Sequence, residues 1–415
     1  AKPQEPLTMI FTLALRNIWR NRRRTLLTLS AMVLSSALLI LALGVFSGML
    51  RDMLATATEQ YTGHVVVSTR DYPEDRDLFS NFDPSPGLLS RIATTAGVEA
   101  VSPRLRAFGL ISHRMSTYPA EVLGIRPDAE RKVTTLAEHL VAGAYLPSKP
   151  GSGAVLGRGL ARKLGVGPGD ELVFVTQAAD GSIGNDLLTV TGVFATGDAA
   201  HDNNLVLVGL PWLQRVMVLD GRIHELALRV KDPMKAAAVA GALNTELPKG
   251  LEARDWGKLL PEMREAIASF DVSRFLVILI LYAATGLGIL NTFFMAVMER
   301  TREFGILMAI GLSPRKVRAT VLLETLFMGA IALVLGVGLG LGMSLYMARV
   351  GIDLSGWITP ITYAGGTILP RLHAVIEPWN LLVPAGLLLV VCLLAGFLPA
   401  NRAARLNPAV AIREE

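Results

Sequence analysis

The chain has 415 residues, a formal net charge of +5 and 51% hydrophobic residues. This hydrophobic fraction is higher than one water-soluble core needs. It therefore excludes a wholly soluble single domain and favours several membrane spans with one soluble domain. Cys392 is the only cysteine, which excludes an intrachain disulfide and a cysteine-based metal site.

Four long runs contain no charged residue. They cover residues 25–50, 275–298, 325–348 and 378–401. Each exceeds the ~20 residues that a helix needs to cross ~30 Å of hydrocarbon, so we expect four transmembrane helices.

Arginine placement predicts the orientation of these spans. Basic residues precede the first span, join the second to the third, and follow the fourth: Arg16, Arg20, Arg22, Arg23 and Arg24, then Arg300 to Arg318, then Arg402, Arg405 and Arg413. By the positive-inside rule these regions and both termini are cytoplasmic, and residues 51–274 and 349–377 are outside. Arg20 to Arg24 could also contact nucleic acid, but their place beside a span favours topology, and we expect no nucleic-acid partner.

The first 24 residues form the predicted cytoplasmic N-terminal segment. Residues 9–21 place their apolar side chains on one face, as expected for an interfacial helix on the cytoplasmic leaflet. The first transmembrane helix is predicted at 25–54, and because no clean cleavage site follows, we expect it to remain as an anchor.

Residues 55–256 differ in composition from the apolar runs, because Gly, Pro and Asp separate short β-branched segments. This pattern predicts an outer domain of mixed α and β structure. The expected elements are strand 64–68, helix 86–96, strand 98–111, strand 224–230, helix 233–247 and strand 251–256. They form two β-α-β units that flank an insert at about 126–221. Within the insert, residues 154–177 predict a strand, a short helix, a Gly-Pro-Gly turn and a second strand.

Few residues in the chain indicate enzyme chemistry. Asp198, His201 and Asp202 share one loop, but such residues more often form turns than bind a metal, and no metal site is predicted. Gly257 and Lys258 form the only Gly-Lys pair, and Leu259 follows where a phosphate-binding loop needs a hydroxyl. We therefore expect a non-catalytic chain without its own cofactor, and any ATP and Mg²⁺ would be bound by a partner.

The segment 257–298 is predicted to form a stalk that continues into the second span. Apolar residues recur at helical spacing from Trp256 to Phe270, namely Trp256, Leu259, Leu260, Met263, Ile267 and Phe270. An ordinary domain helix is the alternative. The remaining predicted segments are a third span at 319–348, an outer loop at 349–377, a fourth span at 378–401 and a cytoplasmic tail at 402–415.

The charged connector at 299–318 joins the second and third spans. Its first half predicts a helix with one apolar face, carrying Phe304, Ile306, Leu307, Met308 and Ile310. Gly311 is suited to ending that helix, with Ser313 as the N-cap and Pro314 in the first turn of the next. Two stiff helices around a sharp corner would form a lever.

Two features of the third span have alternative explanations. Small-x-x-x-small pairs, which permit close helix contact within or between protomers, are Gly336 with Gly340 and Gly338 with Gly342. Glu324 either reaches to the membrane interface or contacts the connector helix.

The connector resembles that of a known family. Its pattern E-R-x-x-E-F-G-x-x-x-A-x-G, followed by Pro314 and Lys316, resembles the cytoplasmic loop of FtsX-like ABC-transporter permeases, which include lipoprotein-releasing, MacB-type and FtsX proteins. Residues 398–413 resemble the family's C-terminus. The resemblance implies an α-helical membrane protein with four transmembrane helices and an α/β (α+β) periplasmic domain inserted between the first and second. It also implies that the connector meets an ATPase through Glu299, Arg300, Arg302, Glu303, Phe304, Gly305, Met308, Ala309, Gly311, Leu312, Pro314, Arg315 and Lys316.

The outer domain resembles the MacB-like periplasmic core, and its insert resembles the lipoprotein-releasing (Lol) branch. This implies a bacterial inner-membrane permease that works with two ATPase subunits, a second permease copy or paralogue, membrane lipids and a lipoprotein substrate. The tip at 178–185 is shorter than the hook by which one Lol subunit grips a soluble periplasmic carrier, which argues against carrier capture by this loop. Residues expected to line a cargo entrance are Phe46, Met49, Leu50, Met53, Phe270, Phe275 and Ile278.

Three other functions remain open. A MacB-type efflux permease is the first, although such pumps normally carry their own ATPase domain. A regulator of periplasmic cell-wall hydrolases would have no transported substrate, and we expect a smaller outer domain for it. A membrane-anchored adaptor would leave the connector unexplained.

Overall fold

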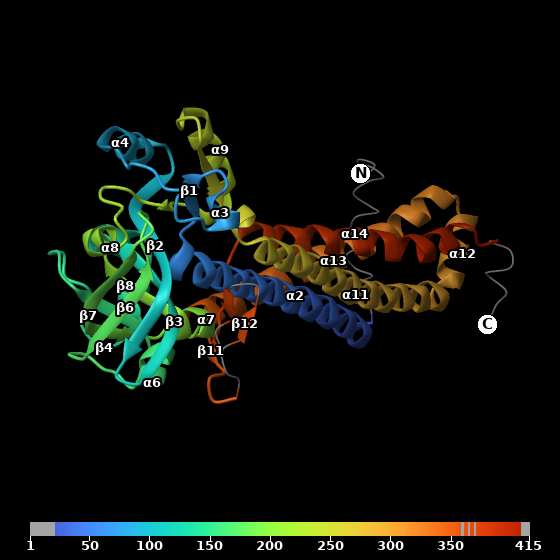
Figure 1. Cartoon of the computed structure of the whole chain (residues 1–415). Helices are drawn as coiled ribbons and strands as arrows, with labels where there is room; N and C mark the ends of the chain where they lie inside the picture. The colour runs from blue at the N-terminus through green and yellow to red at the C-terminus, as the bar shows by residue number, and fades with distance from the viewer. Residues whose placement is uncertain (1–20, 358–360, 364–365, 369–370, 408–415) are drawn as a thin grey trace. The chain divides into compact units, whose positions relative to one another are not determined.

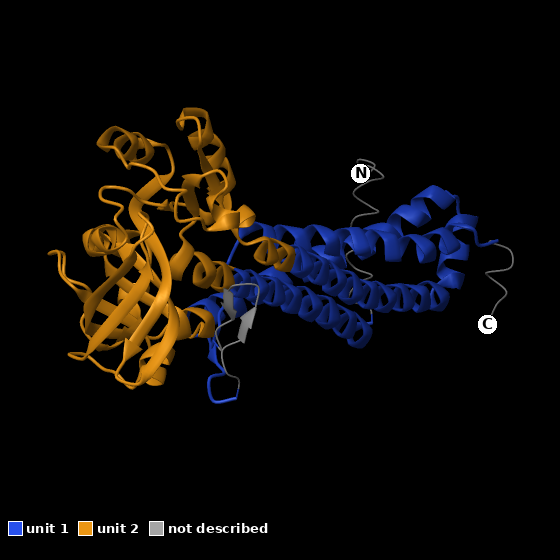
Figure 2. Cartoon of the chain, in the orientation of Figure 1, with its two compact units in different colours: residues 1–50, 268–357, 371–415 blue, residues 51–267, 358–370 orange. Residues whose placement is uncertain are grey.

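The computed structural model describes residues 21–357, 361–363, 366–368 and 371–407. The chain divides into two compact units, one of residues 1–50, 268–357 and 371–415, the other of residues 51–267 and 358–370 (Figure 2). Residues 9–20 of the predicted interfacial helix and residues 408–415 of the predicted tail lie outside the described residues.

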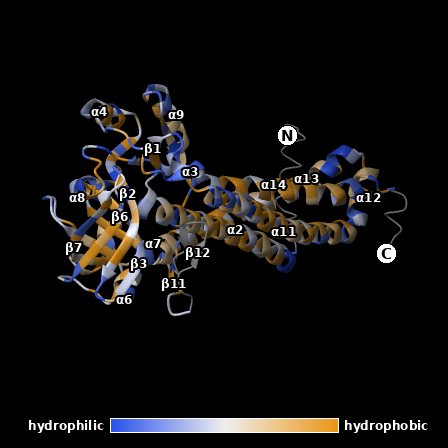
Figure 3. Cartoon of the chain, viewed as in Figure 1, coloured by the Kyte–Doolittle hydropathy of each residue, from blue (hydrophilic) through white to orange (hydrophobic). Residues whose placement is uncertain are grey.

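Four long helices dominate the first unit (Figure 1). Each is long and apolar enough to cross a membrane: α2 (Arg22–Ala57), α11 (Pro261–Glu299), α13 (Pro314–Arg349) and α14 (Pro378–Ala404). Much of the ribbon of these helices has the colour of hydrophobic residues in Figure 3. A helix that is apolar on all sides needs an apolar environment, which agrees with the four predicted spans.

The four helices share one hydrophobic cluster. It contains Met32, Leu39 and Leu43 of α2, Tyr282, Ile289 and Phe293 of α11, Met328 and Ala332 of α13, and Leu388 and Cys392 of α14. The Tyr282 hydroxyl donates to the Pro384 carbonyl at 2.6 Å, so a polar group within this cluster is satisfied.

The two predicted glycine pairs of α13 have different surroundings when they are regrouped by neighbour. A Cβ added at Gly336 would lie 2.9 Å from the Ser36 Cβ, and one added at Gly340 would lie 2.9 Å from the Ile40 Cβ. These two glycines therefore allow α13 to approach α2 closely. Around Gly338 and Gly342 an added Cβ would meet no described atom within 4 Å.

The second unit contains a ten-stranded sheet with two interleaved β-α-β units. The first unit is β1 (Val65–Thr69), α4 (Pro86–Thr94) and β2 (Val98–His113), and the second is β9 (Glu225–Val230), α9 (Ala236–Glu246) and β10 (Leu251–Asp255). The strand order is β10-β1-β9-β2, and every neighbouring pair is antiparallel. This is the ferredoxin-like order, with the insert between its second and third strands. The predicted elements thus match, but the interleaving was not foreseen.

The insert begins at β3, about ten residues before the predicted start at 126, and it extends the same sheet beyond β2. Its order continues as β3-β8-β5-β7-β4, with β6 paired to β2 and β7. The strands are β3 (Ser116–Ile125), β4 (Leu140–Gly143), β5 (Gly153–Gly157), β6 (Glu171–Gln177), β7 (Ile183–Phe194) and β8 (Leu205–Gly209). The helices are α5 (Pro127–Val133), α6 (Arg158–Leu164), α7 (Ala199–Asn204) and α8 (Leu210–Val216). Gln177 pairs with Ile183, so the hairpin tip covers only residues 178–182 and is shorter than the predicted 178–185.

Shorter elements complete the described chain. They are η1 (Thr58–Thr62), α3 (Tyr72–Asp75), η2 (Leu136–His139), η3 (Pro233–Lys235), α10 (Trp256–Leu259), α12 (Thr301–Ala309), β11 (Ile352–Asp353), β12 (Ile361–Tyr363), β13 (Gly366–Ile368) and β14 (Arg371–Leu372).

The predicted continuous stalk is wrong at its start. Its helix is interrupted at Leu260, where φ is −125° and ψ is 72°, and α11 begins at Pro261. The cause is local, because a proline disfavours the helical conformation of the residue before it. From Pro261 to Glu299 the helix is unbroken, as expected for the remainder of the stalk and the second span.

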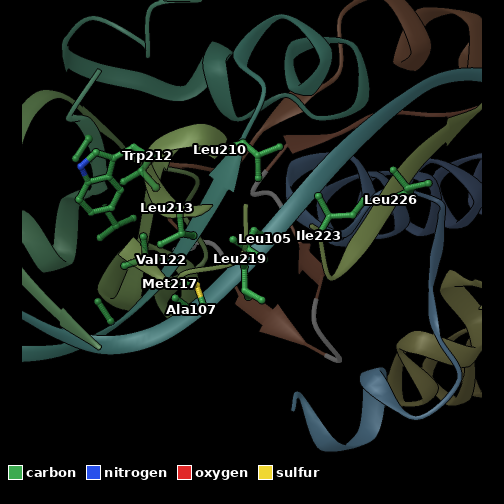
Figure 4. Packing of buried hydrophobic residues seen from close by; sticks show 14 of the residues in the cluster. Leu105, Ala107, Val122, Leu210, Trp212, Leu213, Met217, Leu219, Ile223 and Leu226 are labelled. Carbon is green, nitrogen blue, oxygen red and sulfur yellow. The ribbon is translucent and has the colours of Figure 1, made fainter. Parts of the chain in front are cut away.

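The main core of the second unit joins the interleaved β-α-β units to the insert. In Figure 4, Trp212, Leu213 and Met217 lie close to Val122 and Ala107 of the sheet. Trp212 is only 2% exposed, and its ring centroid lies 6.1 Å from that of Phe174. A large aromatic side chain buried in this way anchors α8 on the sheet.

Candidate coupling site

The connector between α11 and α13 forms a helix and a sharp corner. α11 ends at Glu299, Arg300 lies between the two helices, and α12 covers Thr301–Ala309. Gly311 has φ +102°, and the N–H groups of Gly311 and Leu312 donate to the carbonyls of Met308 and Leu307 at 3.1 and 3.0 Å. This is a Schellman motif, in which one residue has the left-handed backbone conformation. Glycine adopts that conformation without strain.

α13 begins at Pro314, directly after this corner. Ser313 occupies its N-cap position with extended backbone, as predicted, but its side chain makes no capping hydrogen bond. Pro314 has the φ that the first turn needs and lacks an N–H that would be unsatisfied there. The corner is therefore held mainly by backbone geometry.

α12 buries one side and exposes the other. Phe304 is 2% exposed and packs with Val297, Val317, Val321, Ala400 and Ala403. Ile306 and Ile310 are 45% and 76% exposed, so the predicted single apolar face is wrong for these two residues. Each residue turns a helix by about 100°, which places Ile306 nearly opposite Phe304. The exposed residues of the connector are Glu299, Arg302, Ile306, Ala309, Ile310, Gly311, Ser313, Pro314, Arg315 and Lys316.

Arg300 connects α12 to α13. Its Nη1 donates to both carboxylate oxygens of Glu324 at 3.1 Å, and its Nε donates to Glu303 at 3.3 Å. The guanidinium carbon also lies 4.9 Å from the centre of the Phe304 ring. Only 14% of the Arg300 side chain and 7% of the Glu324 side chain are exposed. Of the two explanations for Glu324, contact with the connector is therefore the observed one.

A second ion pair joins α2 to the end of α11. Arg24 Nη1 lies 2.8 Å from Glu299 Oε2, and both side chains are more exposed than Arg300 and Glu324. The two pairs border a recess of about 270 Å³. It is lined by Asn21, Arg24, Thr25, Thr292, Phe293, Ala296, Glu299, Arg300, Glu324 and Met328. Sequence reasoning assigned Arg24 only to topology and missed this contact.

The residues predicted to line a cargo entrance have mixed surroundings. Met53 is fully buried and Phe275 is 62% exposed, while Phe46, Met49, Leu50, Phe270 and Ile278 are partly buried. A groove of about 340 Å³ between α2 and α11 is lined by other residues, among them Ala31, Met32 and Gly288. The entrance assignment stays a prediction.

The three polar residues of the insert loop stabilise their own turn. Asp198 accepts from the Ala200 N–H at 2.9 Å and contacts His201, while Asp202 accepts from the Thr196 N–H at 2.9 Å. Among the described residues, no group of three or more His, Cys, Asp or Glu side chains is arranged to hold a metal ion. These contacts agree with the turn interpretation.

Two family models match most of the chain. The family model described as MacB-like periplasmic core domain matches residues 25–246, and the one described as FtsX-like permease C-terminal matches residues 275–408. The chain belongs to the MacB/FtsX-like family of ABC-transporter permeases. The second match includes the connector, so α12 and its corner lie within the family's shared C-terminal region.

Similar proteins include members of two branches of this family. The lipoprotein-releasing system transmembrane protein LolC of Neisseria meningitidis is 23% identical over 94% of both chains, and LolC of Xylella fastidiosa is 26% identical over 92% of both. The macrolide export ATP-binding/permease protein MacB of Chromobacterium violaceum is 26% identical over 99% of this chain and 62% of that protein.

Proposed function

We propose that this permease is the membrane subunit of a transporter that extracts lipoproteins from the bacterial inner membrane and releases them. Two separate ATPase subunits bind ATP and Mg²⁺, and a second permease copy or paralogue completes the complex. Both termini and the connector are cytoplasmic, and the second unit is periplasmic. Similarity to LolC along nearly the full length of both chains supports this branch.

The exposed face of α12 is the observation that carries the coupling role. Ile306 and Ile310 are apolar yet largely exposed, and the cations Arg302, Arg315 and Lys316 lie on the same connector. Apolar side chains among charges are typical of a surface that a protein partner covers. We propose that the ATPase subunits bind this surface of α12.

The Arg300 contacts determine how a push on this face is transmitted. Because Arg300 binds both Glu303 of α12 and Glu324 of α13, a displacement of α12 moves α13 with it. ATPase binding shifts the permease towards one of two conformations only if the ATPases bind that conformation more tightly than the other. ATP binding and hydrolysis thus alternate the permease between two states.

The docking test uses a charge reversal on α12 and a matched control. Arg302→Glu should abolish copurification of the ATPase when the permease is purified from its native membranes. Arg349→Glu makes the same charge change at the far end of α13 and should have no effect. Equal ATPase recovery with both variants would contradict docking at α12.

The coupling and cargo tests follow from the same proposal. Glu303→Arg should leave folded permease and ATP hydrolysis in place but uncouple them from transport. Crosslinking of the wild-type complex in native membranes should capture acylated lipoproteins, and polar substitution of Met49 or Phe275 should weaken their capture. An ATPase that docks without any lipoprotein being captured would favour the MacB-type alternative.

A further inference from the structure

Six strands of the second unit close into a barrel. β6 pairs with β2 on one side and with β7 on the other, and the pairs β2–β3, β3–β8, β8–β5 and β5–β7 complete the ring (Figure 1). Inside the ring, Leu172, Phe174 and Leu188 belong to the main core of the unit. Because side chains alternate along a strand, the residues next to these point outward from the barrel.

Nine of these outward residues form three rows across β2, β6 and β7. One row joins Leu110 to Val175 and Asn185, and the next row joins Ser112 to Val173 and Leu187. We call this surface the β2–β6–β7 face. It consists of Phe108, Leu110 and Ser112 of β2, Val173, Val175 and Gln177 of β6, and Ile183, Asn185 and Leu187 of β7. Six of the nine are apolar, three are neutral and polar, and none is charged.

Most of the apolar side chains on this face are open to solvent. The exposed fractions are 55% for Phe108, 48% for Leu110, 40% for Val173, 75% for Ile183 and 52% for Leu187. An antiparallel sheet usually presents polar side chains on its solvated face. A solvated face that is apolar instead is typical of a surface that another protein covers.

The absence of charge favours a second copy of this chain as the partner. In a two-fold pair the same surface patch meets itself, so a charged residue within the patch would lie near the same charge on the other copy. The β2–β6–β7 face avoids this repulsion. On the neighbouring strand β3, Pro119 is apolar and Glu121 is already paired with Arg106. A strongly acidic or basic partner would find no opposite charge on this face.

The size of the face is sufficient for such a contact. A large apolar side chain that nothing covers exposes on the order of 150 Å², so the five side chains together expose roughly 400 Å². Two copies would then bury about 800 Å² of apolar side-chain surface. A specific protein contact needs about 1,000 Å² in total, and the backbone and the polar rim supply the remainder.

We propose that the β2–β6–β7 face is the contact between the second units of two copies of this chain. The inference rests on the proposed function in one respect, because it assigns a surface to the second permease copy. A two-fold axis through the middle of the face places Val175 opposite Val175 of the other copy. The apolar rows of one copy then cover those of the other.

The first test compares two valines that have similar exposure. Val173→Asp puts a carboxylate on the face, and Val141→Asp makes the same change on β4, where Val141 is 47% exposed. The association of each full-length variant in a neutral detergent is measured by analytical ultracentrifugation over a range of concentrations. Val173→Asp should raise the dimer dissociation constant at least about tenfold, since its dimer would bury two unpaired carboxylates. Val141→Asp should behave as the wild type.

The second test locates the contact by crosslinking. Packed sheets lie ~10 Å apart, so a short bismaleimide should join two full-length copies that carry Val175→Cys. Val141→Cys is the control and should give little crosslinked dimer. Cys392 is buried in the helical unit and remains in both variants. The unfolding temperature of every variant should stay near that of the wild type, because none of the changes lies in the core.

The outcomes are independent of the ATPase and of the cargo, since both tests use the purified chain alone. Loss of association in Val173→Asp only, together with crosslinking of Val175→Cys only, supports the contact. Equal association of the two aspartate variants, or equal crosslinking of the two cysteine variants, would overturn it. A wild-type chain that stays monomeric at every concentration and is not crosslinked through Val175→Cys would also overturn it and would leave the face to a different protein.

Discussion

Removal of the Glu324 carboxylate tests whether Arg300 fixes α12 to α13. The Glu324→Gln variant loses the charged contacts at 3.1 Å but keeps the Arg300–Glu303 contact and the Phe304 ring beside the guanidinium. Breaking a buried ion pair costs ~3–5 kcal/mol and an exposed pair ~0–1 kcal/mol. With side-chain exposures of 14% and 7%, we expect about 2 kcal/mol for this pair.

A double-mutant cycle isolates this contribution from the others. Glu324→Gln, Arg300→Gln and the double variant are unfolded by heat in detergent, and the coupling energy should be about 2 kcal/mol. The exposed pair provides the control, since Arg24→Gln should cost less than about 1 kcal/mol. Additive single effects at Arg300 and Glu324 would refute the connection between the two helices. If the proposed ATPase subunits push on α12, complexes that contain these permease variants should hydrolyse ATP without matching transport.

Three further predictions concern other parts of the chain. Gly340→Ala should destabilise the helical unit by ~1–3 kcal/mol in thermal unfolding because its Cβ would overlap Ile40, whereas Gly342→Ala has open space and should be neutral or stabilising. Phe304→Ala should cost ~3–5 kcal/mol in the same assay because it leaves a cavity in the cluster beneath α12, and an unchanged unfolding temperature would exclude that packing. Burial opposes ionisation of Glu225, but Arg106 and Arg104 outweigh it and lower its pKa to about 2. Its contribution of about 3 kcal/mol is complete above its ordinary pKa of 4.5 and is lost as the pH falls towards 2, so Glu225→Gln should flatten the acid side of the stability profile.

The sequence predicted the helical unit well because its signals are local. An uncharged run longer than the bilayer is thick has few alternatives to a helix, and the Gly311 to Pro314 corner is determined by backbone preferences within four residues. The contacts of Arg24 with Glu299 and of Arg300 with Glu324 depend on how separate helices pack. No pattern along the chain indicates which helix faces which.

The strand order of the second unit could not be predicted for the same reason. Each strand of the two β-α-β units could be recognised from its own residues, but the order β10-β1-β9-β2 depends on pairing across the whole insert. A cavity of about 420 Å³ in this unit could not be predicted for the same reason. Its walls combine Tyr61 and Tyr72 with Glu225 and Lys258, which lie far apart in the sequence and meet only after the strands interleave.

This interleaving also constrains biosynthesis. Val65 pairs with Leu228 on one side and with Asp255 on the other, so the first strand to emerge has no native neighbour until the ribosome has made almost the entire domain. Such distant pairings slow folding because the intervening chain must close on itself first. A nonsense truncation before residue 225 would remove both neighbours of β1 and leave this strand as an exposed, aggregation-prone edge.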